Sequence, residues 1–248
     1  MVKLTIDGIQ VEAEKGTSIL HAAESVGIEV PTLCYIKDLL PDGSCRMCMV
    51  EIESRGRTKM ETACTAQVAE GLVVTTNSEK VRNARRNILD MLLSNHKTDC
   101  FSCPSNGDCK LQELCFEYGI ERTTYSGEQT ELPIDDSNKF FTYNPNLCIL
   151  CHRCVNTCHK IVGRGAIDTM ERGFDSAIGT PFHIDWADTN CESCGNCVQA
   201  CPTGALTMKR RKNYRKYQID KKVLTTCPHC ATGCQYYLLV KDNKIVDV

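Results

Sequence analysis

The residues best suited to chemistry in this sequence are its 19 cysteines, which gather in short, regularly spaced sets along a chain of 248 residues. Thiols in such numbers serve disulfides, zinc sites, iron–sulfur clusters or catalytic redox reactions. Residues 1–8 reach a turn dipeptide before any apolar run builds up, which is not typical of a secretory signal. We therefore expect a cytoplasmic chain whose thiols are not paired in disulfides, which the reducing cytosol disfavours.

The most specific pattern is a C-x2-C-x2-C-x3-C run that occurs twice, first at Cys148, Cys151, Cys154 and Cys158 and again at Cys191, Cys194, Cys197 and Cys201. In such paired runs, three thiolates hold one [4Fe–4S] cluster and the fourth reaches the cluster of the other run. We therefore predict one cluster on Cys148, Cys151, Cys154 and Cys201, and another on Cys158, Cys191, Cys194 and Cys197. Pro202 fits this pattern, whereas His159 replaces the usual proline after the first run. Paired zinc knuckles are the alternative, although zinc ligands usually come as separated pairs.

A further set near the N-terminus consists of a single thiol, a close pair and a remote fourth: Cys34, Cys45, Cys48 and Cys64. Its layout resembles that of plant-type ferredoxins with a wider first gap, and four cysteines suit a [2Fe–2S] centre. Gly43 and Ser44 precede the pair and would let the backbone approach the inorganic sulfides. Zinc is again the competing metal.

Three cysteines between these sets lack a fourth thiol, namely Cys100, Cys103 and Cys109. His96 stands just upstream and can complete the set, although a lone histidine near a helix end is more often structural or exposed. A neutral imidazole in place of a thiolate would make a cluster less negative and raise its reduction potential. Cys115 lies beyond this set and is interpreted as a buried small hydrophobic residue.

The elements that must position these ligands follow from hydrophobic periodicity. Before residue 77 we expect a β-grasp-like module, with strands at 3–6, 9–13, 49–53, 58–61 and 72–75 and a helix over 18–26 capped by Thr17. A second helix is expected over 78–94, with Arg82, Arg85 and Arg86 on a solvated or partner-facing surface. A short helix before residue 118, a polar connection and a C-terminal hairpin turned at Asp242 and Asn243 complete the expected elements.

The predicted fold class is therefore α+β, built from small modules in series. These are a β-grasp [2Fe–2S] ferredoxin-like domain, a small helical [4Fe–4S] domain with one histidine and three cysteine ligands, a two-cluster bacterial ferredoxin-like domain and a short β-hairpin tail with three cysteines. The expected boundaries are 1–77, 78–120, a connector over 121–143, 144–208, a basic linker over 209–222, and 223–248.

Charge and hydropathy exclude some function classes. The net charge of −2 gives no general reason to expect nucleic-acid binding. The basic stretch 209–222, with Tyr214 and Tyr217, could bind RNA, but a solvated linker or a surface for an acidic partner is favoured. No run of 18 or more apolar residues is present, so we expect no direct membrane insertion.

The order and spacing of the four ligand sets over residues 1–208 closely resemble an iron–sulfur segment found in several enzymes. It occurs in the large iron–sulfur subunit of complex I, the N-terminal half of [FeFe]-hydrogenases, the small diaphorase subunit of NAD-reducing [NiFe]-hydrogenases and the alpha subunit of NAD-linked formate dehydrogenases. This resemblance implies one [2Fe–2S], one His-ligated [4Fe–4S] and two ferredoxin-type [4Fe–4S] clusters. It also implies partners: a flavin-binding NAD(P)H-oxidising subunit of the complex I type, a small thioredoxin-like [2Fe–2S] subunit, and hydrogenase or formate dehydrogenase catalytic subunits.

The tail is similar to the opening of the molybdopterin-dependent formate dehydrogenase region, through Cys227, Cys230 and Cys234. These thiols mark a possible extra iron–sulfur or zinc site that lacks a fourth cysteine within residues 1–248. His229, a partner residue or an exogenous thiol could supply the fourth donor, and a loop without metal is the alternative.

No Rossmann fingerprint, Walker-type phosphate loop or Ser/His/Asp set is visible in the sequence. We therefore expect an oxidoreductase subunit with no substrate site of its own, which relays single electrons between active sites in other chains. The first hypothesis places it in a soluble NAD(P)-linked hydrogenase, with electron bifurcation to ferredoxin as an option. The alternative is a molybdenum or tungsten formate dehydrogenase complex, and a zinc-stabilised RNA-binding protein is a third.

Overall fold

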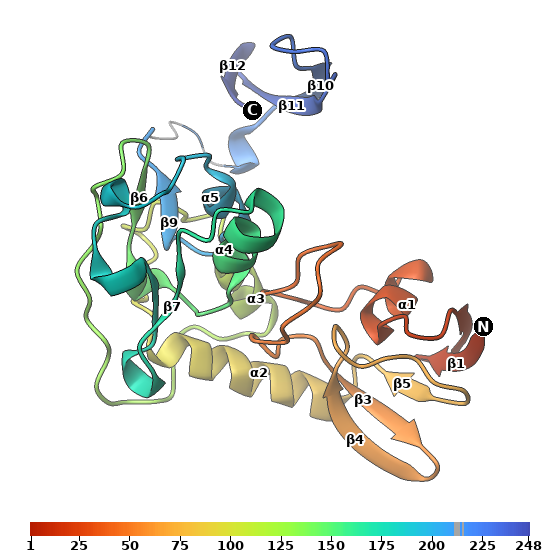
Figure 1. Cartoon of the computed structure of the whole chain (residues 1–248). Helices are drawn as coiled ribbons and strands as arrows, with labels where there is room; N and C mark the ends of the chain where they lie inside the picture. The colour runs from red at the N-terminus through yellow and green to blue at the C-terminus, as the bar shows by residue number, and fades with distance from the viewer. Residues whose placement is uncertain (211–213, 215) are drawn as a thin grey trace.

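The computed structural model describes residues 1–210, 214 and 216–248. The N-terminal part is a five-stranded sheet of order β2-β1-β5-β3-β4 with helix α1 packed against it (Figure 1). Its elements are β1 (Val2–Ile6), β2 (Ile9–Ala13), α1 (Ile19–Ser25), β3 (Met49–Ser54), β4 (Arg57–Thr62) and β5 (Val73–Thr75). Alternate strand residues such as Leu4, Ile6 and Val11 are buried between sheet and helix, as period-two patterning requires. The strands lie close to their expected positions.

One detail of this module differs from expectation, because Ser18 rather than Thr17 caps α1. The Ser18 hydroxyl accepts the backbone N–H of His21 at 3.3 Å. The carbonyl of Thr17 accepts the N–H of Val68 at 2.9 Å, while its own N–H donates to the Glu14 carbonyl. The backbone of Thr17 is therefore committed to a contact with a neighbouring segment, and the capping position moves one residue along the chain.

Helix α2 (Glu79–Ser94) is capped by Ser78 and runs from the sheet toward the part of the molecule that carries α3 and β7 (Figure 1). The expectation of an exposed arginine surface is wrong for Arg85, which is only 3% exposed. Its guanidinium donates to the Tyr118 hydroxyl at 3.0 Å and to the Met49 carbonyl at 2.8 Å. Helix α3 (Lys110–Glu117) ends beside Tyr118 and covers this face of α2.

The part after residue 140 is built on two small antiparallel sheets and two short helices. β6 (Phe141–Tyr143) pairs with β9 (Leu206–Met208), and β7 (Asp168–Met170) pairs with β8 (Ala177–Gly179). The helices are α4 (Arg153–Asn156), which continues as the π-helix η2 (Thr157–Val162), and α5 (Asn196–Ala200). Short 3-10 turns lie at η1 (Pro145–Leu147), η3 (Gly173–Asp175), η4 (Pro181–His183) and η5 (Trp186–Asp188). Trp186 anchors this body, with its ring centroid 5.1 Å from that of Phe141 and 5.4 Å from that of Tyr143. Strand β6 lies within the stretch expected to be a connector.

The C-terminal residues form a separate three-stranded antiparallel sheet of order β10-β11-β12, which projects from the rest of the chain (Figure 1). It follows the turn η6 (Lys216–Gln218) and comprises β10 (Lys221–Thr226), β11 (Gln235–Lys241) and β12 (Lys244–Asp247). The expected turn at Asp242 and Asn243 is present, with positive φ at both residues. Strand β10 is an addition to the expected hairpin, because its sequence begins with two lysines and lacks the alternation of apolar and polar residues that predicts a strand. Residues 211–213 and 215 of the basic stretch lie outside the described residues. None of the described helices is long and apolar enough to cross a membrane.

Candidate metal centres

The two repeated cysteine runs line two cavities, and the fourth thiol of each run lines the cavity of the other run. One cavity is lined by Cys148, Cys151, Cys154 and Cys201, and a second by Cys158, Cys191, Cys194 and Cys197. Helices α4 and α5 pack side by side, and an exchanged cysteine follows closely after each. Across residues 1–210, 214 and 216–248, no group of three or more His, Cys, Asp or Glu side chains is gathered as for a single metal ion.

The ligand loops take a backbone shape that turns amide groups toward sulfur. Leu150 and Ser193 have φ of 50° and 55°, in the left-handed region that residues other than glycine seldom adopt. In this conformation the Leu150 nitrogen lies 3.4 Å from Cys148 Sγ, and the Ser193 nitrogen lies 3.4 Å from Cys191 Sγ. Such N–H donors stabilise a thiolate or a sulfur-bound cluster and raise its reduction potential.

Burial makes several of the thiols that line the two cavities poor free anions. It raises the pKa of Cys148 to about 11 and that of Cys151 to about 12, and it raises the pKa of Cys154 well above its usual range. Burial likewise raises the pKa of Cys197 to about 12, with a further contribution from Cys191. A bound cation deprotonates a coordinating thiol outright and offsets the charge of several thiolates. The chemistry of the donor set therefore fits an iron–sulfur cluster in each cavity.

The N-terminal set is arranged as two pairs: Cys48 and Cys64 lie in the core of the first module, and Cys34 and Cys45 lie in the neighbouring buried cluster that α2 and α3 share. The Cys34 thiol donates to Cys45, so the pKa of Cys34 is raised and that of Cys45 is lowered, to about 6. In the second pair Cys64 donates to Cys48, which raises the pKa of Cys64 and lowers that of Cys48. All four side chains are buried. Two pairs of adjacent thiols fit a centre with two irons, each of which takes two protein ligands.

His96 lies just beyond the end of α2 and is 7% exposed. Burial lowers the pKa of its imidazole to about 4, and its buried Nδ1 has no hydrogen-bond partner among the described residues. A neutral buried imidazole with an unused nitrogen is a suitable metal ligand, because an unpaired buried polar atom is otherwise costly. Cys100, Cys103 and Cys109 lie on the loop between α2 and α3.

Cys115 is buried as expected, at 8% exposure. Its pKa is raised to about 11, first by burial and then by Cys109 and Cys100. It therefore lies near the His96 set, whereas its sequence context indicates only a core residue. Its position makes it the natural control for the role of His96.

Ligands of one module also pack against residues of another module. An added Cβ at Gly204 would lie 2.7 Å from Cys103 Sγ, so only glycine allows this approach. The sequence predicts no role for Gly204, although a Gly-Ala dipeptide recurs after each cysteine run and could have signalled it. On the other side, Cys45 shares a buried cluster with Met47, Ile149 and Cys151.

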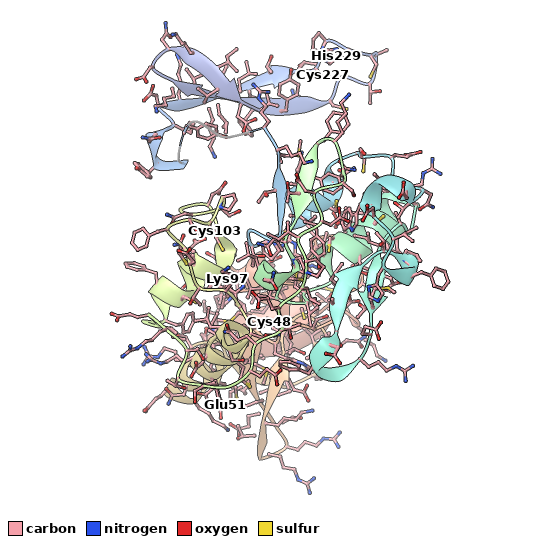
Figure 2. All side chains as sticks on the ribbon, turned by 90° about the vertical axis from the view of Figure 1, so that its left-hand side faces the viewer. Cys48, Glu51, Lys97, Cys103, Cys227 and His229 are labelled. Atoms are coloured by element: carbon pink, nitrogen blue, oxygen red, sulfur yellow. The ribbon has the colours of Figure 1, made fainter. Side chains whose placement is uncertain are left out.

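The three tail cysteines are placed differently. Cys227 is half-buried, whereas Cys230 and Cys234 are exposed, and the Cys227 N–H donates to the Cys234 carbonyl at 2.8 Å. Figure 2 shows Cys227 and His229 together on the C-terminal sheet, well away from Cys103 and Cys48. The tail therefore brings its loop together by backbone hydrogen bonding and is not continuous with the other sets.

Four known families match successive and partly overlapping parts of the chain. Residues 1–79 match the family described as a 2Fe-2S iron-sulfur cluster binding domain, and residues 85–124 match the NADH-ubiquinone oxidoreductase-G iron-sulfur binding region. Residues 140–207 match the ferredoxin-like domain of NADH-quinone oxidoreductase subunit 3, and residues 190–237 match a 4Fe-4S dicluster domain. The chain is thus a mixed α/β protein with one 2Fe-2S domain and several 4Fe-4S ferredoxin-like domains.

Individual proteins similar to this chain are also described as subunits of NAD(P)-linked oxidoreductases. A G-type subunit of NADH-quinone oxidoreductase from Rhizobium meliloti is 42% identical over 100% of this chain, and NADPH-Fe(3+) oxidoreductase subunit alpha of Geobacter sulfurreducens is 43% identical over 99%. The chain spans 29% and 28% of their lengths. A chain in a crystal structure of NAD+-reducing [NiFe]-hydrogenase in the H2-reduced state is 30% identical with a TM-score of 0.77, over 84% of this chain and 88% of that one. The chain therefore belongs to the family of iron–sulfur domains shared by NADH-quinone oxidoreductases, NADPH-Fe(3+) oxidoreductases and NAD(P)-reducing hydrogenases.

Proposed function

We propose that this chain holds one [2Fe–2S] and three [4Fe–4S] clusters and relays single electrons from a flavin-bearing NAD(P)H-oxidising partner to another redox partner. The [2Fe–2S] ligands are Cys34, Cys45, Cys48 and Cys64. The [4Fe–4S] ligands are His96 with Cys100, Cys103 and Cys109; Cys148, Cys151 and Cys154 with Cys201; and Cys191, Cys194 and Cys197 with Cys158. Each cluster, when bound, accepts or gives one electron at a time.

The observation that carries this proposal is the continuity of the four ligand sets through the packed interior. Cys45 and Cys151 belong to one buried cluster of side chains. Cys103 lies against Gly204, within three residues of Cys201. Cys154 and Cys197 are close enough for Cys197 to raise the pKa of Cys154, after burial and the nearer thiols. A chain of neighbouring centres is what a relay requires, whereas isolated structural zinc sites would need no such contacts.

The protein's own residues contribute geometry and electrostatics to this role. The left-handed residues of the ligand loops direct backbone N–H groups at Cys148 and Cys191, and the neutral imidazole of His96 carries no negative charge into its set. Both features favour the reduced state of the bound group. The set that contains His96 would therefore differ in reduction potential from the sets of four thiolates.

We further propose that the complex is an NAD(P)-linked hydrogenase, with a complex I-type flavin subunit and a small thioredoxin-like [2Fe–2S] subunit as partners. The similarity to the hydrogenase chain, which covers 88% of that chain, supports this choice. Electron bifurcation to ferredoxin is the extended form of the proposal. Bifurcation would be supported if the purified complex reduces ferredoxin only when NAD(P) is also converted, in the presence of hydrogen.

The tail favours a second candidate, an equivalent subunit of an NAD(P)-linked molybdenum or tungsten formate dehydrogenase. Its support is the spacing of the three tail cysteines alone; the relatives that match nearly the whole chain are described as NADH-quinone and NADPH-Fe(3+) oxidoreductase subunits. In this candidate Cys227, Cys230 and Cys234 would hold a further cluster or zinc with a fourth donor. Metal analysis of the co-purified complex separates the two: nickel supports the hydrogenase, and molybdenum or tungsten supports the formate dehydrogenase.

The first experiment is to measure iron, acid-labile sulfide and zinc per chain after anaerobic purification. The four centres need about 14 irons per chain. Electron paramagnetic resonance (EPR) spectra of the reduced chain should then resolve a [2Fe–2S] signal beside several [4Fe–4S] signals. A colourless chain that contains zinc without sulfide would refute the relay and favour the RNA-binding alternative.

A further inference from the structure

The loop that carries Cys45 is joined by polar contacts to the loop between Cys151 and Cys154. Ser44 Oγ lies 3.3 Å from Nδ1 of His152, and the other ring nitrogen, Nε2, lies 3.2 Å from Thr169 Oγ1. A neutral imidazole donates through one nitrogen and accepts through the other, and a hydroxyl can do either, so both contacts can be satisfied together. His152 is thus held from both sides.

A second polar contact reinforces the same junction. Asn156 Nδ2 donates to the Asp42 carboxylate, and Lys160 Nζ lies 3.7 Å from it. Beneath these groups Met47 and Ile149 pack in one buried cluster with the flanking cysteines. The contact between the two loops therefore combines buried apolar packing with polar contacts at its edge. Among the polar side chains, His152 lies directly after the ligand Cys151.

The backbone of His152 is also specialised. Its φ is 59°, and it is the residue directly before α4, whose second residue is Cys154. Asparagine is among the few residues that tolerate this conformation well. A side chain in this position, tied to a second module, fixes the orientation of the ligand loop relative to that module.

We propose that His152 is a positioning residue that sets the electronic coupling between the centre of Cys45 and the centre of Cys151, through its hydrogen bond to Ser44. This inference rests on the proposed function. In the step that it assists, one electron leaves the first centre and arrives at the second; no covalent bond is made or broken. His152 acts by holding the two ligand loops at a constant separation.

The two ring nitrogens can be tested separately in the full chain. His152→Asn keeps a polar atom near the Nδ1 position and suits the positive φ, whereas His152→Gln keeps one near the Nε2 position only. Ser44→Ala removes the partner hydroxyl without touching the ligand loop of Cys151, and Thr169→Val serves as the matched control on the other nitrogen. Iron content and midpoint potentials are measured for each variant.

Two readouts report coupling: the relaxation of the reduced [2Fe–2S] EPR signal beside a reduced [4Fe–4S] centre, and the rate of transfer between them by freeze-quench EPR. We expect His152→Gln and Ser44→Ala to slow transfer about ten-fold, the lower end of the effect of losing a partner that orients a ligand. Iron content and potentials should stay unchanged, and His152→Asn and Thr169→Val should behave like the unaltered chain. Because His152→Gln and Ser44→Ala break one bond, their combination should slow transfer no further.

Unchanged relaxation and rate in both His152→Gln and Ser44→Ala would overturn this role. So would loss of iron from His152→Asn as well as His152→Gln, since His152 would then be needed to fold the ligand loop. Failure of the proposed function is distinguishable, because the unaltered chain would itself lack iron and cluster EPR signals.

Discussion

Replacing Gly204 with alanine should remove one cluster selectively. The added Cβ would lie 2.7 Å from Cys103 Sγ and 3.3 Å from Leu147 Cδ1. Ordinary contacts between such atoms are about 3.5–4.0 Å, so Cys103 must retreat by about 1 Å. The loop of Gly204 cannot move away easily, because Thr203 Oγ1 donates to the Leu147 carbonyl at 2.8 Å and the Lys110 N–H donates to the Pro202 carbonyl at 2.9 Å.

The displacement is large by the standard of metal coordination, where ligand distances hold within about ±0.2 Å. We therefore expect the chain with Gly204→Ala to lose the cluster of His96, Cys100, Cys103 and Cys109, and its iron content to fall from about 14 to about 10 per chain. Overpacking of this kind also costs about 1–3 kcal/mol of folding free energy.

The measurement combines iron and sulfide per chain with EPR spectra of the fully reduced protein. Gly127→Ala is the matched control, because an added Cβ there meets nothing within 4 Å and the residue has no positive φ. The reasoning is wrong if Gly204→Ala retains its full iron and every EPR signal. It is also wrong if Gly127→Ala loses the same cluster, since the loss would then not come from the contact with Cys103.

Further predictions concern other ligand and packing residues. His96→Ala should lose about four irons, whereas Cys115→Ala, beside the same set, should lose none; iron analysis decides, and the reverse result would make the thiol the ligand. Cys201→Ala should remove the EPR signal of the first cysteine run and spare that of the second, and loss of the second signal alone would contradict the exchange of ligands between runs. Arg85→Met leaves a buried tyrosine hydroxyl and a strand carbonyl without their donor, at a cost of about 3 kcal/mol. For a chain of this size that lowers the thermal midpoint by about 6–12 °C in a calorimetric scan, and a change no larger than that of the exposed Arg82→Met would refute the inferred burial penalty.

The arginines of α2 illustrate why hydrophobic periodicity predicts where a helix lies more reliably than it predicts which of the helix's side chains are covered by other elements. Apolar spacing correctly places the helix over nearly its full length, because each turn is set by nearby residues. Whether Arg85 faces water depends on α3, which arrives from later in the chain and leads to Tyr118. The helical pattern alone assigns a charged side chain to solvent, and only the long-range packing shows that two acceptors receive it.

The cap of α1 and the edge strand β10 likewise depend on contacts that the local sequence does not specify. Thr17 and Ser18 are both good capping residues, and the choice between them depends on the contact that uses the backbone of Thr17. Strand β10 has mostly exposed side chains and owes its pairing to the neighbouring β11. Its sequence therefore carries little of the alternation from which strands are predicted.

Spacing along the chain predicts which cysteines share a set, since three thiols separated by two residues lie on one loop, and that is a local property. It is also enough to indicate the family, because four such sets in one order are a specific pattern. How the sets meet is visible only in the folded chain, where Gly204 admits Cys103, Ser44 reaches His152 and Arg85 is covered. These contacts join residues far apart along the chain, and their geometry follows from the packing of whole modules, which no local spacing encodes.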